Sequence, residues 1–151
     1  MKETPYHYSE CGVENIYLSN GFKCIETSRG KAISIKDIDG LHKAIGTYLI
    51  TSKKDLSGEE IRFLRNEMLM SQSTLAQLLG VTEQTVLRWE KGKTTIPKSA
   101  EFLVRLLYHE YLHDKEGNLS NMLKKIANME NELSEEPIYF KDTGKGWTTA
   151  A

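Results

Sequence analysis

The chain has 151 residues and a formal net charge of −1, with 20 Lys and Arg against 21 Asp and Glu. This balance excludes a global positive field that would draw the protein to any nucleic acid, so a basic surface has to be local. The length is enough for one or two small domains with real cores. The two cysteines, Cys11 and Cys24, exclude a disulfide framework and suit a reducing cytosol.

The sequence contains no apolar run approaching the ~18 residues that a membrane span needs. Its N-terminus, MKETPYHY, is polar and unlike a signal peptide. We therefore expect a soluble, cytoplasmic protein.

Residues 1–55 predict a small α/β domain. The segments 13–18, 22–27 and 32–38 have strand patterns separated by the turn signals SNG and SRG, which predicts a three-stranded antiparallel sheet. Apolar residues then follow at helical spacing, and we expect this helix to cover the sheet. They are Leu41, Ala44, Ile45, Tyr48 and Leu49. A boundary is expected within residues 53–58.

Residues 56–113 predict an all-α domain. A helix over residues 59–70 faces the core with Ile61, Leu64 and Met68, and two short helices follow it. Beyond Pro97, a long amphipathic helix carries an apolar set that consists of Phe102, Leu103, Leu106 and Leu107.

Residues 114–151 predict a helical C-terminal extension. A helix over residues 119–133 has one apolar stripe, made of Leu119, Met122, Leu123, Ile126 and Met129. The tail that follows holds Ile138, Tyr139, Phe140 and Trp147, and such aromatic residues are more often packing residues than ligand contacts. The fold class that these segments predict together is α+β.

The most informative segment is residues 71–97, SQSTLAQLLGVTEQTVLRWEKGKTTIP. Ser71 and Thr82 are each placed to cap a short helix. Gly80 lies between the two helices, where the first must end in a positive φ that glycine adopts without steric cost. The segment therefore predicts a helix, a glycine turn and a second helix that ends in a basic loop.

The apolar residues of these two helices predict how they pack. Leu75 and Leu79 share one face of the first helix and would bury against Val86 and Trp89 of the second. The second helix then presents a polar, donor-rich face away from the core. That face holds Gln84, Leu87, Arg88 and Lys91, with Glu83 at its margin.

Over residues 57–108 the chain resembles the Xre/Cro/CI helix-turn-helix family. The residues that carry the resemblance are Ser71-Gln72, Leu75-Ala76, Leu79-Gly80-Val81, Thr85-Val86 and Arg88-Trp89-Glu90-Lys91-Gly92-Lys93. The resemblance implies a transcriptional regulator that places its second helix in the major groove of DNA. It implies that Gln72 touches the DNA backbone or an edge base, and that Gln84 and Arg88 point at base edges.

The chemistry of the side chains agrees with this implication. Arg donates two hydrogen bonds to guanine and Gln pairs bidentately with adenine, while lysines after the helix suit phosphate contacts. The predicted DNA-binding residues are Gln72, Ser73, Glu83, Gln84, Thr85, Leu87, Arg88, Lys91, Lys93 and Thr94. Glu83 either favours its helix N-terminus or accepts from a cytosine amino group. The alternative is a solvated helix face that contacts no base.

One such motif contacts only a few base pairs, which is too little for useful specificity. We therefore expect a homodimer on a palindromic operator, most simply acting as a repressor. The long helix after Pro97 and the helix over residues 119–133 are the expected dimer surfaces.

A small sheet ahead of such a motif also resembles the MqsA (YgiT-type) antitoxins, whose N-terminal domain holds zinc with two Cys-x-x-Cys pairs. The resemblance implies an antitoxin whose N-terminal domain binds a toxin. The four ligand positions here are Tyr8 and Cys11, then His42 and Ile45, and a structural zinc needs four thiolate or imidazole ligands. We therefore expect apolar packing instead of zinc, and no cofactor. Further candidate ligands at a nonstandard spacing are His7 and Cys24. A plain regulator, whose N-terminal domain senses a small molecule or another partner, is the competing interpretation.

Residues 109–113 spell His-Glu-x-x-His, the zinc motif of zincin metalloproteases, with Glu110 as general base. A metalloprotease is therefore the alternative function. The sequence downstream offers neither a clear third ligand nor a strand to present a peptide. We expect no enzyme, and two histidines that favour a helix C-terminus.

Overall fold

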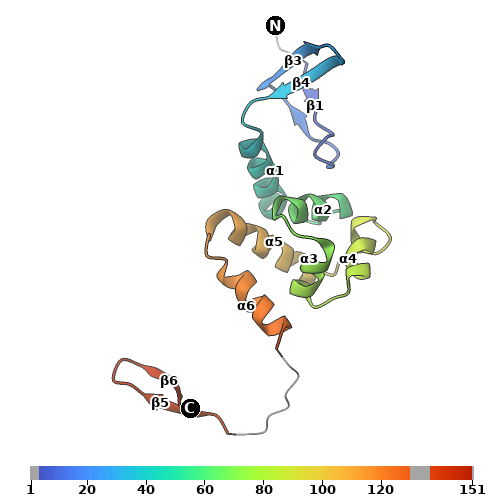
Figure 1. Cartoon of the computed structure of the whole chain (residues 1–151). Coiled ribbons are helices and arrows are strands. Elements are labelled where there is room, and N and C mark those ends of the chain that lie inside the picture. Colours follow the sequence, from blue (N-terminus) through green and yellow to red (C-terminus); the bar gives the residue numbers. More distant parts are fainter. Residues whose placement is uncertain (1–3, 130–136, 151) are drawn as a thin grey trace.

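The structure, a computed structural model, describes residues 4–129 and 137–150. The strands are β1 (Tyr6–His7), β2 (Tyr17–Leu18), β3 (Phe22–Thr27), β4 (Gly30–Ile35), β5 (Tyr139–Asp142) and β6 (Trp147–Ala150). The helices are α1 (Ile38–Ser52), α2 (Gly58–Glu67), α3 (Gln72–Leu79), α4 (Glu83–Glu90), α5 (Lys98–His113) and α6 (Asn118–Ala127). In space, the N-terminal strands lie at one end of the molecule, the helices in the middle and the β5–β6 hairpin at the other end (Figure 1). The predicted α+β class is confirmed.

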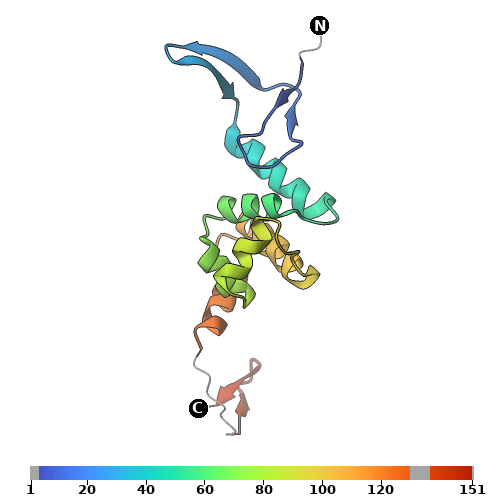
Figure 2. The ribbon, with the colours of Figure 1, turned by 90° about the vertical axis from the view of Figure 1, so that its right-hand side faces the viewer.

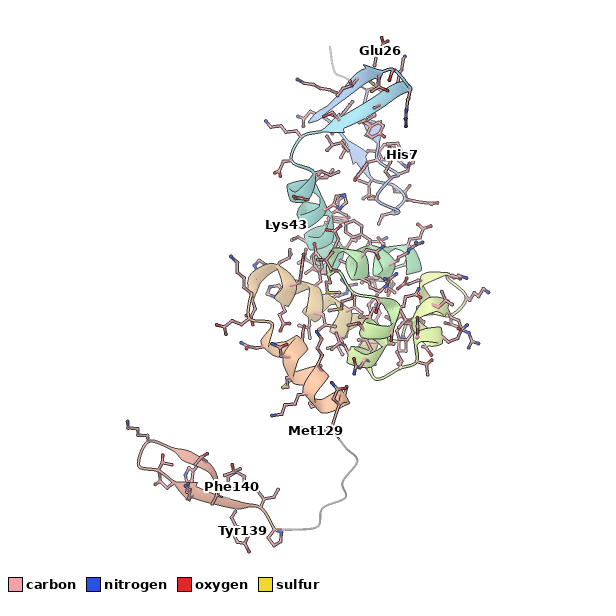
Figure 3. All side chains as sticks on the ribbon, in the orientation of Figure 1. His7, Glu26, Lys43, Met129, Tyr139 and Phe140 are labelled. Carbon is pink, nitrogen blue, oxygen red and sulfur yellow. The ribbon has the colours of Figure 1, made fainter. Side chains whose placement is uncertain are left out.

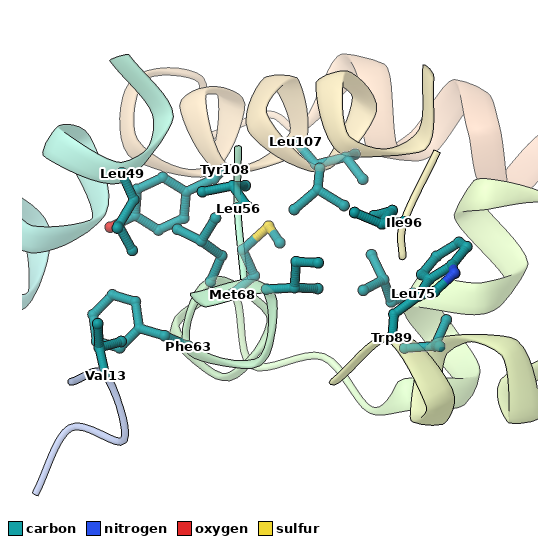
Figure 4. Packing of buried hydrophobic residues seen from close by; sticks show 14 of the residues in the cluster. Val13, Leu49, Leu56, Phe63, Met68, Leu75, Trp89, Ile96, Leu107 and Tyr108 are labelled. Carbon is teal, nitrogen blue, oxygen red and sulfur yellow. The ribbon is translucent and has the colours of Figure 1, made fainter. Parts of the chain in front are cut away.

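The N-terminal strands form two separate antiparallel pairs, β1 with β2 and β3 with β4. The predicted three-stranded sheet is therefore wrong, and the turn at residues 19–21 joins two sheets. The cause is the segment before β2, where Val13 is buried in the same apolar cluster as Phe63 of α2 (Figure 4). This contact takes the segment away from β3, and only Tyr17 and Leu18 enter a sheet, paired with β1.

The strand predicted over residues 32–38 ends at Ile35. Asp37 caps α1, with its side chain accepting a hydrogen bond of 3.2 Å from the Gly40 N–H. Local capping thus converts the end of the expected strand into the first turn of a helix.

Helix α1 packs on α5 and covers the strands only at its N-terminal end, where Leu41 borders a hollow together with Leu18 and Ile35. Its buried residues include Gly46, where an added Cβ would collide with the ring of Tyr108 of α5. Tyr48, expected on the covering face, is 57% exposed, and Ala44 is exposed as well. A glycine at the crossing lets the two helices approach closely, so the tertiary contact selects the buried face of α1.

The segment between α1 and α2 is tied to α5. The Leu56 N–H donates to the Glu101 carboxylate at 2.5 Å, and Arg105 donates to the carbonyl oxygens of Leu49 and Lys53 at 3.0 and 2.7 Å. Ser57 and Glu60 then form a capping box that starts α2. The hydrogen bonds from Arg105 satisfy carbonyl oxygens at the C-terminal end of α1.

One apolar cluster extends through the described helices and reaches the N-terminal strands. The predicted inward residues of α2 are confirmed, with Ile61, Leu64 and Met68 at 1%, 0% and 6% exposure. From α5, Val104 and Leu107 join the cluster at 0% and 1% exposure, and Figure 4 shows Leu107 there beside Tyr108. Because these apolar side chains are removed from water together, the cluster holds the helices in fixed positions relative to one another.

At the C-terminal side, α6 lies against α3, and Gln77 donates to Asn128 at 2.8 Å. The predicted helix over residues 119–133 is present to Ala127, and positions 130–133 lie outside the described residues. The predicted tail forms an antiparallel hairpin, β5 with β6, so the expectation that no strand follows residue 113 is wrong. In the described part of the chain, no helix is long and apolar enough to cross a membrane.

Candidate nucleic-acid interface

The helix pair α3–α4 has the predicted caps. The Ser71 hydroxyl accepts a hydrogen bond from the Thr74 N–H at 3.0 Å, and the Thr82 hydroxyl accepts one from the Thr85 N–H at 3.2 Å. Gly80 ends α3 with φ 69°, a left-handed conformation that favours glycine. The angle between the two helices is therefore set by local sequence as well as by packing.

The packing between the helices is also as predicted at three of four positions. Leu75 and Val86 are 0% exposed, and Trp89 is 4% exposed. Leu79 is only partly buried and packs at the edge of the cluster. Because one face of α4 is buried in this way, its opposite face is directed away from the body (Figure 2).

The C-terminal end of α4 is held by α2. Arg65 of α2 donates to both carboxylate oxygens of Glu90, at 2.7 and 2.9 Å, and to the Met70 carbonyl at 2.9 Å. The same carboxylate accepts from the Gln72 amide at 3.2 Å. Arg65 and Glu90 are both buried, and a buried charge needs this kind of paired, hydrogen-bonded partner.

Gly58 adds a second contact between these helices. A Cβ at this position would collide with the Trp89 carbonyl oxygen and lie 2.7 Å from that of Glu90. The first turn of α2 therefore packs directly on the last carbonyls of α4. The opposite dipoles of the two helix ends favour this arrangement.

The predicted DNA-binding residues divide into two groups by exposure. The exposed residues are Ser73, Glu83, Gln84, Arg88, Lys91, Lys93 and Thr94, and the partly buried ones are Gln72, Thr85 and Leu87. The amide of Gln72 is bound to Glu90, and the hydroxyl of Thr85 lies 2.8 Å from that of Thr82. Gln84 and Arg88 stand one turn apart on the solvent face of α4.

Two hollows border this face. One of about 510 Å³ lies between α2, the start of α3 and α4, and one of about 910 Å³ lies between α2, the loop after α4 and the N-terminal loop at residues 10–12. Arg62 and Lys91 line both hollows. Arg62 is exposed and was missed by the sequence analysis, although it precedes Arg65 by one helical turn. It adds a cation to the basic loop that contains Lys91 and Lys93.

Two of the candidate zinc ligands of the N-terminal region, His42 and Cys11, have other partners. The two ring nitrogens of His42 lie 2.7 Å from the Tyr8 hydroxyl and 2.6 Å from a Glu67 carboxylate oxygen. The Cys11 thiol donates to the backbone carbonyls of Tyr8 and Val13, and burial raises its pKa. Among the residues that the structure describes, no three His, Cys, Asp or Glu side chains gather as metal ligands.

The His-Glu-x-x-His motif lies at the end of α5. Glu110 is buried and caps α6, because its carboxylate accepts from the N–H groups of Leu119 and Ser120 and from the Ser120 hydroxyl at 2.5 Å. A carboxylate that accepts from three such donors satisfies free N–H groups at the start of α6. His109 and His113 are exposed, with ring centroids 4.5 Å apart.

A comparison with known protein families finds that residues 61–106 match the model of the Helix-turn-helix family (HTH_3). These residues include α3, α4 and most of α2 and α5, so the segment is a helix-turn-helix domain of the Xre/Cro/CI type and belongs to a DNA-binding regulator. Neither the comparison with curated proteins nor that with solved structures found a match.

Proposed function

We propose that the protein is a sequence-specific repressor that binds a palindromic operator as a homodimer. The observation that supports this most directly is the opposed orientation of neighbouring residues on α4. Arg88 is exposed, whereas Trp89 is 4% exposed and anchors the helix from behind. A helix held in this way presents donors to the major groove without first having to be ordered.

The site residues have distinct roles in the proposal. Arg88 and Gln84 contact base edges, since their donors and acceptors match guanine and adenine in the major groove. Lys91, Lys93 and Arg62 contact phosphates, which position the domain without selecting sequence. The remaining predicted residues form the rim of the contact. They are Gln72, Ser73, Glu83, Thr85, Leu87 and Thr94.

The bond between Gln72 and Glu90 gives Gln72 a defined orientation before DNA arrives. Its amide nitrogen donates to the buried carboxylate at 3.2 Å, which leaves the second N–H of the amide as a donor for a phosphate oxygen at the start of α3. Through this bond α2, α3 and α4 share one carboxylate. We propose that this arrangement sets the spacing between the backbone contact of α3 and the base contacts of α4.

Selection of bound duplexes from a random pool by the full chain tests the proposal. We expect an enriched inverted repeat whose half-site centres are about one helical turn, or a multiple of it, apart, and a complex with two chains per duplex by sedimentation. A pool that stays random after repeated selection would overturn sequence-specific binding. An enriched site without symmetry, bound by one chain, would overturn the dimeric arrangement.

In vitro transcription then tests repression. The enriched site is placed across a promoter, and bound protein should block the polymerase and reduce transcript in proportion to occupancy. A scrambled site of equal composition is the control. An increase of transcript at the enriched site would make the protein an activator and contradict the proposed repression.

A toxin-binding role for the N-terminal region is a second candidate. The loop at residues 10–12 borders the same hollow as Lys91 and Lys93, so a protein bound at that loop would sit beside the proposed DNA contact. Co-purification with the product of the adjacent gene, followed by a competition for operator DNA, tests this role. Absence of a complex at micromolar concentrations would remove it.

A further inference from the structure

The C-terminal hairpin has one apolar face. In the β5–β6 register Phe140 lies opposite Thr149 and Asp142 lies opposite Trp147. Because side chains alternate across a strand, Phe140, Asp142 and Trp147 share one face, and Tyr139 lies on the other. Phe140 is 60% exposed and Trp147 is 74% exposed. We call this surface, with Phe140, Asp142 and Trp147, the hairpin face.

A hairpin of this size requires cover. Two strands of four residues each are marginally stable alone, because they bury too little apolar surface. An aromatic side chain buries ~150–250 Å² of surface when it is covered. Covering Phe140 and Trp147 would therefore stabilise the hairpin. Figure 3 shows the hairpin, with Tyr139 and Phe140, away from the described helices.

Helix α6 has a second uncovered apolar surface. Leu119 and Leu123 pack partly against the core, but α6 has no buried residue. Met122 and Ile126 lie one turn apart on α6, and Met129 lies two residues past its last residue; they are 51%, 54% and 59% exposed. We call these three residues the α6 stripe. Methionine side chains adapt to aromatic rings and make favourable sulfur–aromatic contacts.

The two surfaces also match in charge. Asp142 places a carboxylate on the hairpin face beside Trp147. Lys125 lies on α6 three residues after Met122 and next to Ile126, so it flanks the α6 stripe on the helix surface. The hairpin face, which carries one acidic residue, is therefore complementary in charge to the α6 stripe, which has one basic residue at its edge.

We propose that the hairpin face of one chain covers the α6 stripe of a second copy, so that two chains exchange their C-terminal hairpins. This inference deepens the homodimer of the proposed function and rests on it. The seven residues 130–136 span up to ~25 Å, which is enough for the hairpin to reach its own α6. In the structure of a single chain, however, the hairpin face and the α6 stripe are both exposed. A reciprocal exchange forms two equivalent contacts, related by a two-fold axis, and covers both surfaces of each chain.

Cysteine cross-linking between separately made chains tests the exchange. Both chains carry Cys24→Ser to remove the exposed thiol; one carries Ile126→Cys with a tag, and the other carries Phe140→Cys. The two proteins are mixed at low concentration, so that dimers dissociate, and are then concentrated together and mildly oxidised. We expect a disulfide-linked pair of one tagged and one untagged chain. Tyr139→Cys, on the opposite side of the hairpin, is the matched control and should give at least tenfold less product. Absence of the mixed product, or equal product from the control, would overturn the exchange.

Sedimentation equilibrium separates this inference from the proposed homodimer. Phe140→Ser with Trp147→Ser should raise the dimer dissociation constant at least tenfold, whereas Tyr139→Ser should leave it within twofold. A charge reversal, Asp142→Lys, should weaken the dimer, and Lys125→Asp in the same chain should restore it. If the unaltered chain is dimeric but insensitive to these changes, the exchange is wrong and the homodimer stands. If it is monomeric at all concentrations, both are wrong.

Discussion

Arg65 and Glu90 form a buried ion pair with two hydrogen bonds, Nε to Oε2 at 2.7 Å and a terminal guanidinium nitrogen to Oε1 at 2.9 Å. Their side chains are 11% and 3% exposed. The pair joins α2 to the last turn of α4, and the same carboxylate also holds Gln72 at the start of α3. The orientation of the proposed DNA contact therefore depends on a residue that is itself hidden from DNA.

We predict that Glu90→Ala lowers the free energy of unfolding by ~3–5 kcal/mol, because it leaves the Arg65 guanidinium buried without its partner. Urea denaturation followed by circular dichroism measures this change. Glu83→Ala, at an exposed position of the same helix, is the control and should change stability by at most ~0.5 kcal/mol. Equal effects from the two variants would show that the ion pair has no special role.

Arg88→Ala should weaken binding to the selected operator by ~1–3 kcal/mol and relax base preference at one position of each half-site. The physical reason is the loss of two donors that are directed at one base. Gel-shift titrations against operators with single substitutions measure both effects. A uniform loss on every sequence would instead assign Arg88 to the phosphates.

Lys93→Ala should weaken binding to all sequences equally and reduce the slope of log K against log salt by about one, because one phosphate contact is lost. We expect the same result for Arg62→Ala, since Arg62 lines both hollows with Lys91. Lys115→Ala, an exposed position in the turn between α5 and α6, should leave the slope unchanged. Salt titrations that show no change for a variant would remove that residue from the interface.

Acid should destabilise the protein partly through Glu101, which is 2% exposed. Burial opposes its charge, but the Leu56 N–H, Lys98 and Arg105 outweigh burial and hold the pKa of Glu101 below its usual value. A carboxyl with a lowered folded-state pKa contributes stability above its unfolded pKa of ~4.3 and loses it as pH falls through the folded value.

The free energy of unfolding of the unaltered protein should therefore fall more steeply below about pH 4.3 than that of Glu101→Gln. The difference between the two proteins should be constant near neutral pH and shrink on acidification. Denaturant titrations at a series of pH values provide the measurement. Parallel curves down to pH 3 would contradict the assignment.

Tyr108→Phe should raise or preserve stability, by ~0–2 kcal/mol, because removing a buried hydroxyl without a partner also removes its desolvation cost. Among the described residues the Tyr108 hydroxyl has no hydrogen-bond partner, and the residue is 0% exposed. Thermal unfolding measures the change. A loss above ~1 kcal/mol would indicate a hydrogen bond to a buried water.

The tertiary structure corrected the sequence analysis where a contact between distant residues decides the outcome. The alternation of residues 13–18 suits a strand, but Val13 packs with Phe63 and the sheet is split. Tyr48 belongs to the predicted apolar set of α1, yet it is 57% exposed, whereas Gly46, outside that set, is buried against Tyr108. In both cases the local pattern allowed two packings, and a partner far along the chain selected one.

The His-Glu-x-x-His motif shows the same limit in chemical terms. Its spacing is compatible with a zinc site, and nothing local distinguishes a general base from a helix cap. Glu110 acts as a cap because α6 starts next to it, with the Leu119 and Ser120 N–H groups directed at its carboxylate.

By itself the sequence determined the caps at Ser71 and Thr82, the glycine turn at Gly80 and the burial of Val86 and Trp89, because each depends on neighbours within one or two helical turns. Only the tertiary structure placed Arg65 and Gln72 on Glu90 and placed Arg62 and Lys91 around the same two hollows. Those contacts join separate helices, and periodicity within one helix contains no information about which residues of another helix will meet it.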